Sequence, residues 1–275
     1  MMDFHFSTHD DLQLCAYAHI NPTPKAVLIF LHGLNEHAGR YGYPIDYFSK
    51  NYSLYLYDQR GHGRSAGRRA FVDSFQDYVK DLARFVALVA NKEPGRKIFL
   101  IAHSMGGQVA LNYLGTHSQA PLTGFVTSSP NIRIAWKVSR FKKALALKIA
   151  NCFPRLRVLN EVNPKWISRD KAWVRSFVLD PLVNKIMTIN LAKEIIMNQE
   201  HLVDLAANIH LPALMLHAGD DHICSPQGSR DFFANLGSQD KTLKIYYGFY
   251  HEIFNDPERE QVFGDIEKWV KDRIL

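Results

Sequence analysis

The sequence contains few cysteines, no long apolar run and no start typical of a secreted protein. Its cysteines, Cys15, Cys152 and Cys224, are an odd and scattered set without a Cys-x-x-Cys pair, so they predict neither a disulfide framework nor a cysteine metal site. The longest apolar runs are shorter than a membrane-spanning helix, and the acidic residues among the first eleven do not suit a signal peptide. A reducing, cytoplasmic location is therefore expected.

Acidic residues are absent from one segment, residues 131–160, which carries eight Lys and Arg side chains. Removing these eight from the total of 33 leaves 25 basic residues against all 27 acidic ones, so the net charge of +6 belongs to this segment alone. No nucleic-acid-binding motif accompanies the charge, and we expect no nucleic-acid partner.

Apolar runs of strand length alternate with helical patterns through most of the chain. Short strands are expected before Pro24, and further strands at 26–31, 53–57, 97–102, 121–127, 212–217 and 242–247. Helices are expected at 41–50, from Ser74 to Pro94, at 105–114, 227–236 and 257–274. This alternation predicts an α/β fold with a mainly parallel central sheet flanked by helices, and functional residues at the carboxyl ends of its strands.

The alternation fails between residues 131 and 208, where the sequence predicts several helices without an intervening strand. We therefore expect a core domain formed by residues 1–130 and 209–275, with a helical cap, 131–208, inserted into it.

A candidate nucleophile lies where a buried strand is followed at once by a helix, in Ala102-His103-Ser104-Met105-Gly106. Small residues on either side of Ser104 allow a sharp turn that raises its hydroxyl above the sheet, and the helix N-terminus provides free N–H groups for an oxyanion. Here Ala102 replaces the more usual glycine. The alternative is that Ser104 only caps the helix.

A serine nucleophile needs a histidine base and a carboxylate that orients it, in the chain order Ser, Asp or Glu, His. His251 follows the last expected strand and precedes the last helix, so it is the predicted base. Asp221 follows the preceding strand and is preferred as the acid over Asp220, which is expected to shape the turn. His222 adjoins the acid and is expected to point elsewhere.

The tetrahedral oxyanion needs two backbone N–H donors. We assign these to Leu34, in the loop after the first buried strand, and to Met105, which follows the nucleophile. The alternative for His32-Gly33 is a plain turn that ends the strand.

The chain resembles the monoacylglycerol lipase and lysophospholipase group of α/β hydrolases, a group also described as serine aminopeptidase-type. The resemblance covers nearly the whole chain and rests on His32-Gly33, Glu36-His37, Gly39-Arg40-Tyr41, Gly61-His62-Gly63-Arg64-Ser65, His103-Ser104-Met105-Gly106-Gly107, Asp180-Pro181-Leu182, Asp221 with Cys224, and Tyr250-His251-Glu252. It implies an α/β-hydrolase fold, and it places Glu36 and Arg40 near the polar head of the substrate. Three residues before Asp180 these lipases often have a tyrosine, where this chain has Phe177.

Within the basic segment, apolar residues recur at spacings of three and four and predict one face of an amphipathic helix; they are Ile134, Val138, Phe141, Leu145, Ile149 and Cys152. Two interpretations stand side by side. The face packs on the core while the lysines stay in water, or it binds a lipid surface as a peripheral membrane contact.

These patterns predict a serine hydrolase that cleaves carboxylic esters of a small lipid-like substrate, monoacylglycerol or lysophospholipid, through an acyl-enzyme on Ser104. No metal site and no organic cofactor are implied. The alternatives are an esterase, acyltransferase or aminopeptidase with the same triad, or a lipid- or partner-binding module without catalysis. An epoxide hydrolase or dehalogenase would need an aspartate at Ser104.

Overall fold

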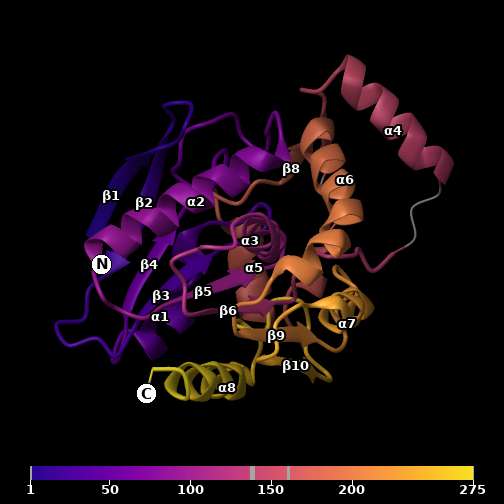
Figure 1. The fold of residues 1–275 in the computed structure, drawn as a ribbon. Helices are drawn as coiled ribbons and strands as arrows, with labels where there is room; N and C mark the ends of the chain where they lie inside the picture. The colour runs from indigo at the N-terminus through magenta and orange to yellow at the C-terminus, as the bar shows by residue number, and fades with distance from the viewer. Residues whose placement is uncertain (1, 137–139, 160–161, 275) are drawn as a thin grey trace.

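The computed structural model describes residues 2–136, 140–159 and 162–274, and only the backbone of residues 140–145. Its central sheet contains β1 (Met2–Ser7), β2 (Gln13–His19), β3 (Val27–Leu31), β4 (Ser53–Tyr57), β5 (Ile98–His103), β6 (Gly124–Ser128), β9 (Ala213–Ala218) and β10 (Lys241–Tyr246). The strand order is β1-β2-β4-β3-β5-β6-β9-β10, as Figure 1 shows. The pairs β1–β2 and β2–β4 are antiparallel and all later pairs are parallel, which confirms the expected α/β architecture.

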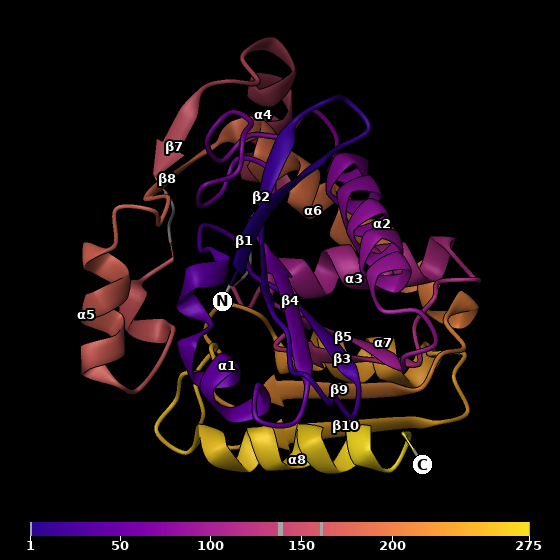
Figure 2. The same cartoon turned by 90° about the vertical axis from the view of Figure 1, so that its left-hand side faces the viewer.

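Helices cover both faces of this sheet. On one face lie α2 (Phe75–Lys92), α3 (Met105–Thr116) and α7 (Pro226–Asn235), and on the other lie α1 (Gly42–Phe48) and α8 (Arg259–Lys271). Figure 2 shows α8 running beside β10.

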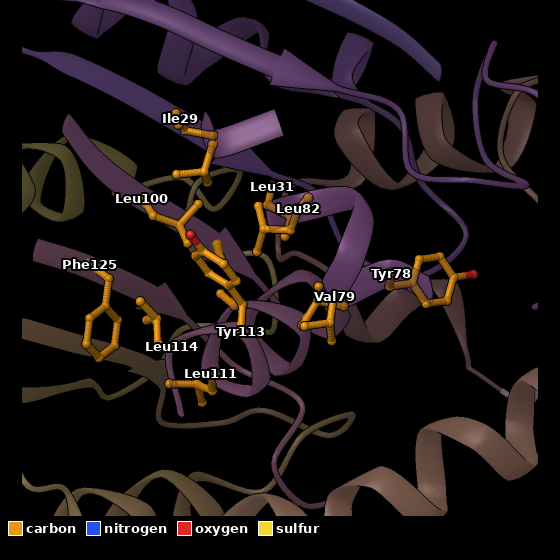
Figure 3. Close-up of a cluster of buried hydrophobic side chains, with 14 of the residues drawn as sticks. Ile29, Leu31, Tyr78, Val79, Leu82, Leu100, Leu111, Tyr113, Leu114 and Phe125 are labelled. Atoms are coloured by element: carbon orange, nitrogen blue, oxygen red, sulfur yellow. The ribbon is translucent and has the colours of Figure 1, made fainter. Parts of the chain in front are cut away.

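Because both faces are covered, every residue of β3 is buried and its side chains alternate between two cores. Ile29 and Leu31 face α2 and α3, where they join Leu100, Val79 and Leu111 (Figure 3). Leu28 and Phe30 face the opposite core with α1 and α8. The strands below the carboxyl ends of the sheet are thereby packed from both faces.

Residues 131–208 lie between the neighbouring strands β6 and β9. They contain α4 (Arg140–Cys152), α5 (Lys171–Leu179) and α6 (Ile189–Leu205), with short 3₁₀ turns at Pro164–Trp166 and Ala206–Asn208, in addition to the turn Ala38–Arg40 in the core. They also contain β7 (Arg157–Leu159), which pairs antiparallel with β8 (Ile186–Thr188). The expectation of helices without a strand is therefore wrong. Each strand has only three residues, too few for an alternating pattern to be recognised.

The apolar face predicted from Ile134 to Cys152 does not form as one helix face. Ile134 precedes α4 and makes an isolated antiparallel bridge with Cys224, while Cys152 is exposed at the helix end. Val138 and the side chains of Phe141 and Leu145 lie outside the described residues. α4 packs beside α6 at the periphery of the molecule, with Ala150 buried (Figure 1). Within the described ranges, no helix combines the length and the hydropathy needed to span a bilayer.

Candidate active site

The predicted catalytic side chains meet at one edge of the sheet. Ser104 follows β5, Asp221 lies in the loop after β9, and His251 lies in the loop after β10. Leu34 follows β3, the neighbour of β5. Parallel strands bring their carboxyl ends to the same edge, which explains how residues so far apart in sequence converge.

Ser104 occupies a strained turn between β5 and α3. Its φ of 52° and ψ of −120° are unusual for a residue with a side chain. Its amide donates to the Ser128 carbonyl at 2.9 Å, and its own carbonyl accepts from Gln108 and Asn131. These bonds hold the backbone conformation in which the Ser104 hydroxyl lies beside His251.

His251 links the hydroxyl to the carboxylate. Its Nε2 lies 2.9 Å from Ser104 Oγ, and its Nδ1 lies 2.7 Å from Asp221 Oδ2. Burial disfavours a charge on the imidazole, but Asp221, followed by Glu252 and Glu36, more than offsets this and raises the pKa of His251 above its usual value. Such a histidine accepts a proton readily.

Asp221 is fixed on both of its oxygens. Oδ1 accepts from the backbone amides of Ile223 and Cys224, at 2.8 and 2.9 Å, and His217 Nε2 lies 3.3 Å from Oδ2. Burial opposes the ionisation of Asp221, but His251 and His217 outweigh it and hold its pKa below the usual range.

The other two candidates in this loop point elsewhere. The exposed Asp220 uses its amide to bond the Phe249 carbonyl, and His222 is exposed between the rings of Trp166 and Tyr250. Thus Asp221, and not its neighbour, faces the imidazole.

Two backbone N–H groups beside the hydroxyl have no hydrogen-bond partner among the described residues, those of Leu34 and Met105. The loop that carries Leu34 turns at Asn35, whose φ is 65°, a value that asparagine tolerates better than most residues. Gly33 packs so closely on Ser104 that a β-carbon there would lie 3.0 Å from the Ser104 Cβ. The two N–H groups lie on the segments expected to hold the oxyanion.

Glu36 and Arg40 belong to a buried network of charges. Glu36 Oε1 accepts from the Gly33 amide at 2.6 Å, and Arg40 pairs with Glu252 at 3.0 Å. Burial and the nearby Glu252 raise the pKa of Glu36 above its usual range, although Arg40 opposes this. Glu36 lines the large cavity described below, whereas Arg40 does not.

Two further residues of this network were not assigned from the sequence. Glu252 adjoins His251, and Trp173 on α5 donates from its indole N–H to Glu252 Oε2 at 2.6 Å. The Arg40 guanidinium lies between the rings of Trp173 and Phe177, 4.6 and 4.7 Å from their centres. A charged residue directly after the predicted base was the available signal for Glu252, but no local pattern identifies Trp173 as its partner.

A cavity of about 370 Å³ opens beside Ser104 and His251. Most of its wall is apolar and comes from residues 131–208; these apolar residues are Ile134, Trp136, Ala146, Val158, Leu159, Val162, Ile167, Phe177, Met187, Ile189, Ala192, Ile195 and Ile196. The lining side chains that can carry a negative charge are Glu36 and Glu252, and no Lys or Arg lines it within the described part of the chain. The size and the lining suit an apolar small molecule with a polar end at the triad.

Comparison with known proteins identifies the family. The model of the serine aminopeptidase S33 family matches residues 22–258, so the chain belongs to this family of hydrolases. It is similar to the monoacylglycerol lipase of Mycolicibacterium smegmatis, with 31% identity over 249 residues that cover 90% of this chain and 88% of that protein.

The chain also shares its fold with solved structures over nearly its whole length. The crystal structure of a soluble variant of monoglyceride lipase from Saccharomyces cerevisiae, in complex with a substrate analog, has a TM-score of 0.88 and 25% identity, covering 99% of this chain and 94% of that one. The chain is thus an α/β hydrolase.

A longer relative is an uncharacterized abhydrolase domain-containing protein of Dictyostelium discoideum, 34% identical over 253 residues. The match covers 91% of this chain but only 27% of that protein.

Proposed function

We propose that this protein is a serine hydrolase that cleaves carboxylic esters of lipid-like substrates. The observation that carries the proposal is the continuous contact from Asp221 through His251 to the Ser104 hydroxyl, with distances of 2.7 and 2.9 Å. The family and the monoacylglycerol lipases among its relatives support the same chemistry.

In the first half of the reaction, Ser104 Oγ attacks the ester carbonyl carbon while His251 Nε2 takes the hydroxyl proton. The N–H groups of Leu34 and Met105 stabilise the oxyanion. The intermediate then collapses, the carbon–oxygen bond to the alcohol breaks, and the imidazolium returns its proton to the departing alcohol. Asp221 stabilises the imidazolium charge throughout.

In the second half, water attacks the acyl-enzyme carbonyl as His251 Nε2 takes one of its protons. When the second tetrahedral intermediate collapses, the proton returns to Ser104 Oγ and the fatty acid leaves. Both protons of the water are accounted for, and the enzyme is restored.

The same proposal takes residues 131–208 as the cap that encloses the acyl chain, because they contribute most of the apolar wall. At the polar end, Glu36 and Glu252 are paired with Arg40, which does not line the cavity, so no Lys or Arg of the described lining is left to bind the phosphate of a lysophospholipid. The lack of such a cation favours a substrate with a neutral, hydroxyl-bearing head group, so we propose monoacylglycerol as the preferred substrate class.

Labelling with a fluorophosphonate probe tests the nucleophile. The wild type should be labelled once per chain and Ser104→Ala not at all, and label that persists in Ser104→Ala contradicts the proposal.

A panel of long-chain monoacylglycerol, lysophosphatidylcholine, a short-chain p-nitrophenyl ester and an aminoacyl p-nitroanilide then separates a lipase from an esterase or aminopeptidase. Product analysis with added alcohol detects acyl transfer.

We further propose that the cap contacts an anionic lipid surface. Leu159 lines the cavity and is 77% exposed, so the cavity reaches the surface beside β7. Phe153 and Leu156 are also exposed there, and Arg155 and Arg157 lie in the same stretch of chain. Exposed apolar side chains together with basic ones suit the boundary of an anionic membrane.

Co-sedimentation with phosphatidylglycerol and phosphatidylcholine vesicles tests this contact. We expect a preference for phosphatidylglycerol that is lost in the Arg155→Glu, Arg157→Glu variant. The matched control, Lys268→Glu with Lys271→Glu, changes the charge by the same amount on α8. Equal binding to both lipids, or an equal loss in the control, rules the contact out.

A further inference from the structure

The loop that carries the catalytic base is bonded to residues 166–173, which lie outside the central sheet. The Glu252 amide donates to the Ile167 carbonyl at 2.7 Å, and the His251 amide lies 3.4 Å from the Trp166 carbonyl. The backbone on either side of the imidazole is therefore attached to the proposed cap.

Side chains of the same segment hold the loop a few residues further on. Ser168 Oγ donates to the Asn255 carbonyl at 2.9 Å, and Arg169 donates from its backbone amide and its Nε to Asp256, at 2.7 and 2.9 Å. Asp256 in turn accepts from the amide of Tyr250, the residue before the base, at 3.0 Å. The segment thus holds the loop on both sides of His251.

Trp173 completes this attachment from α5. Its indole N–H donates to the buried Glu252 carboxylate, which also accepts from Arg40 and from Asn255. Burial raises the pKa of Glu252, but Arg40, followed by His103, Trp173 and Asn255, outweighs it, so the carboxylate stays charged. A buried charge keeps its hydrogen-bond donors because losing one leaves it poorly solvated.

We propose that residues 166–173 position the catalytic histidine, with Trp173 as the principal positioning residue, so that the placement of the cap sets the turnover rate as well as the shape of the substrate cavity. This inference rests on the proposed function. Trp173 does not line the cavity, whereas Phe177, one turn later on the same helix, does. Both side chains flank the Arg40 guanidinium, but only Phe177 also lines the cavity. Kinetic measurements on variants of each residue can therefore distinguish positioning of the base from substrate binding.

Trp173→Phe keeps an aromatic ring over Arg40 but removes the N–H that Glu252 accepts. We expect kcat to fall about tenfold with KM unchanged, a smaller loss than the roughly 100-fold that a misplacement of 1 Å can cause. Phe177→Leu should change KM for long-chain monoacylglycerol and leave kcat nearly unchanged. Ser176→Ala is the matched control on α5, because this exposed hydroxyl donates to the Trp173 carbonyl of its own helix and has no other partner in the described part of the chain.

Each kcat is expressed per active site, counted by the end point of fluorophosphonate titration, so that unfolded protein does not lower it. A Trp173→Phe enzyme with fewer active sites but an unchanged kcat per site, or with a raised KM and an unchanged kcat, overturns the inference. A wild type that neither takes up the probe nor turns over ester contradicts the proposed function instead. Failure of the positioning inference and failure of the proposed function therefore give different results.

Discussion

The substitution Gly106→Ala tests how closely the nucleophile turn is packed against the oxyanion loop. A β-carbon at Gly106 would lie 2.4 Å from the His32 carbonyl oxygen and 2.7 Å from that of Leu31. Ordinary contact begins at about 3.5 Å, so the two segments would have to separate by roughly 1 Å. Both oxygens belong to backbone at the end of β3, which is hydrogen-bonded on both sides and cannot easily move.

Overpacking of this kind costs about 3 kcal/mol at the upper end of its usual range, and the better helix propensity of alanine returns about 1 kcal/mol. We therefore expect Gly106→Ala to lower the free energy of unfolding by about 2 kcal/mol. The matched control is Gly264→Ala in α8, where a β-carbon meets nothing within 4 Å. The control should gain about 1 kcal/mol from propensity alone.

We expect Gly106→Ala to have a larger effect on kcat than on the free energy of unfolding. Met105 and Leu34, the proposed oxyanion donors, lie on opposite sides of this contact, so its opening moves them apart. A loss of about 100-fold in kcat is expected, comparable to the removal of one donor. Urea unfolding and ester hydrolysis per active site provide the measurements. A Gly106→Ala enzyme that is as stable and as active as Gly264→Ala would refute the reasoning.

Three other tests, one of them with a control variant, each address a single interaction. Asp221→Asn should lower kcat by about 10⁴-fold in ester hydrolysis, while Asp220→Asn should leave it unchanged; equal losses in both would remove Asp221 from its proposed role. Glu36→Gln keeps an acceptor for the Gly33 amide but removes a negative charge that raises the pKa of His251. Because the base acts when neutral, the acidic limb of the kcat/KM profile should move to lower pH, and a limb that stays or moves upward contradicts this. The Ser74 hydroxyl accepts from the Gln76 amide and caps the N-terminus of α2. Ser74→Ala should therefore lower the free energy of unfolding, measured in urea, by about 1 kcal/mol without changing kcat.

The sequence predicts the central sheet well because most of its strands are buried on both faces. β3, β4 and β5 appear as continuous apolar runs, and their observed bounds differ from the predicted ones by at most one residue at either end. The sequence also predicts the candidate site, for a related reason. In a parallel sheet, the loops that follow the strands lie at the same edge, and Ser104, Asp221 and His251 each follow a strand that the sequence predicts.

Residues 131–208 are less predictable because their structure depends on contacts far apart in sequence. β7 and β8 are too short to leave a pattern, and Ile134 pairs with Cys224 instead of extending α4. The bond between Trp173 and Glu252 joins residues 79 apart, and neither side chain carries a local sign of it. Tertiary packing decides such features.

Residues 131–208 cross the sheet, since β6 and β9 are parallel neighbours and the segment leaves β6 at its carboxyl end and enters β9 at its amino end. A segment inserted between adjacent strands can be exchanged for one of another length without altering the strand order. Substrate range can diverge by such exchanges while the chemical groups at the sheet edge stay the same. Residues 166–173 limit such exchanges, because a replacement segment must also form hydrogen bonds to the loop that carries His251 if kcat is to be maintained.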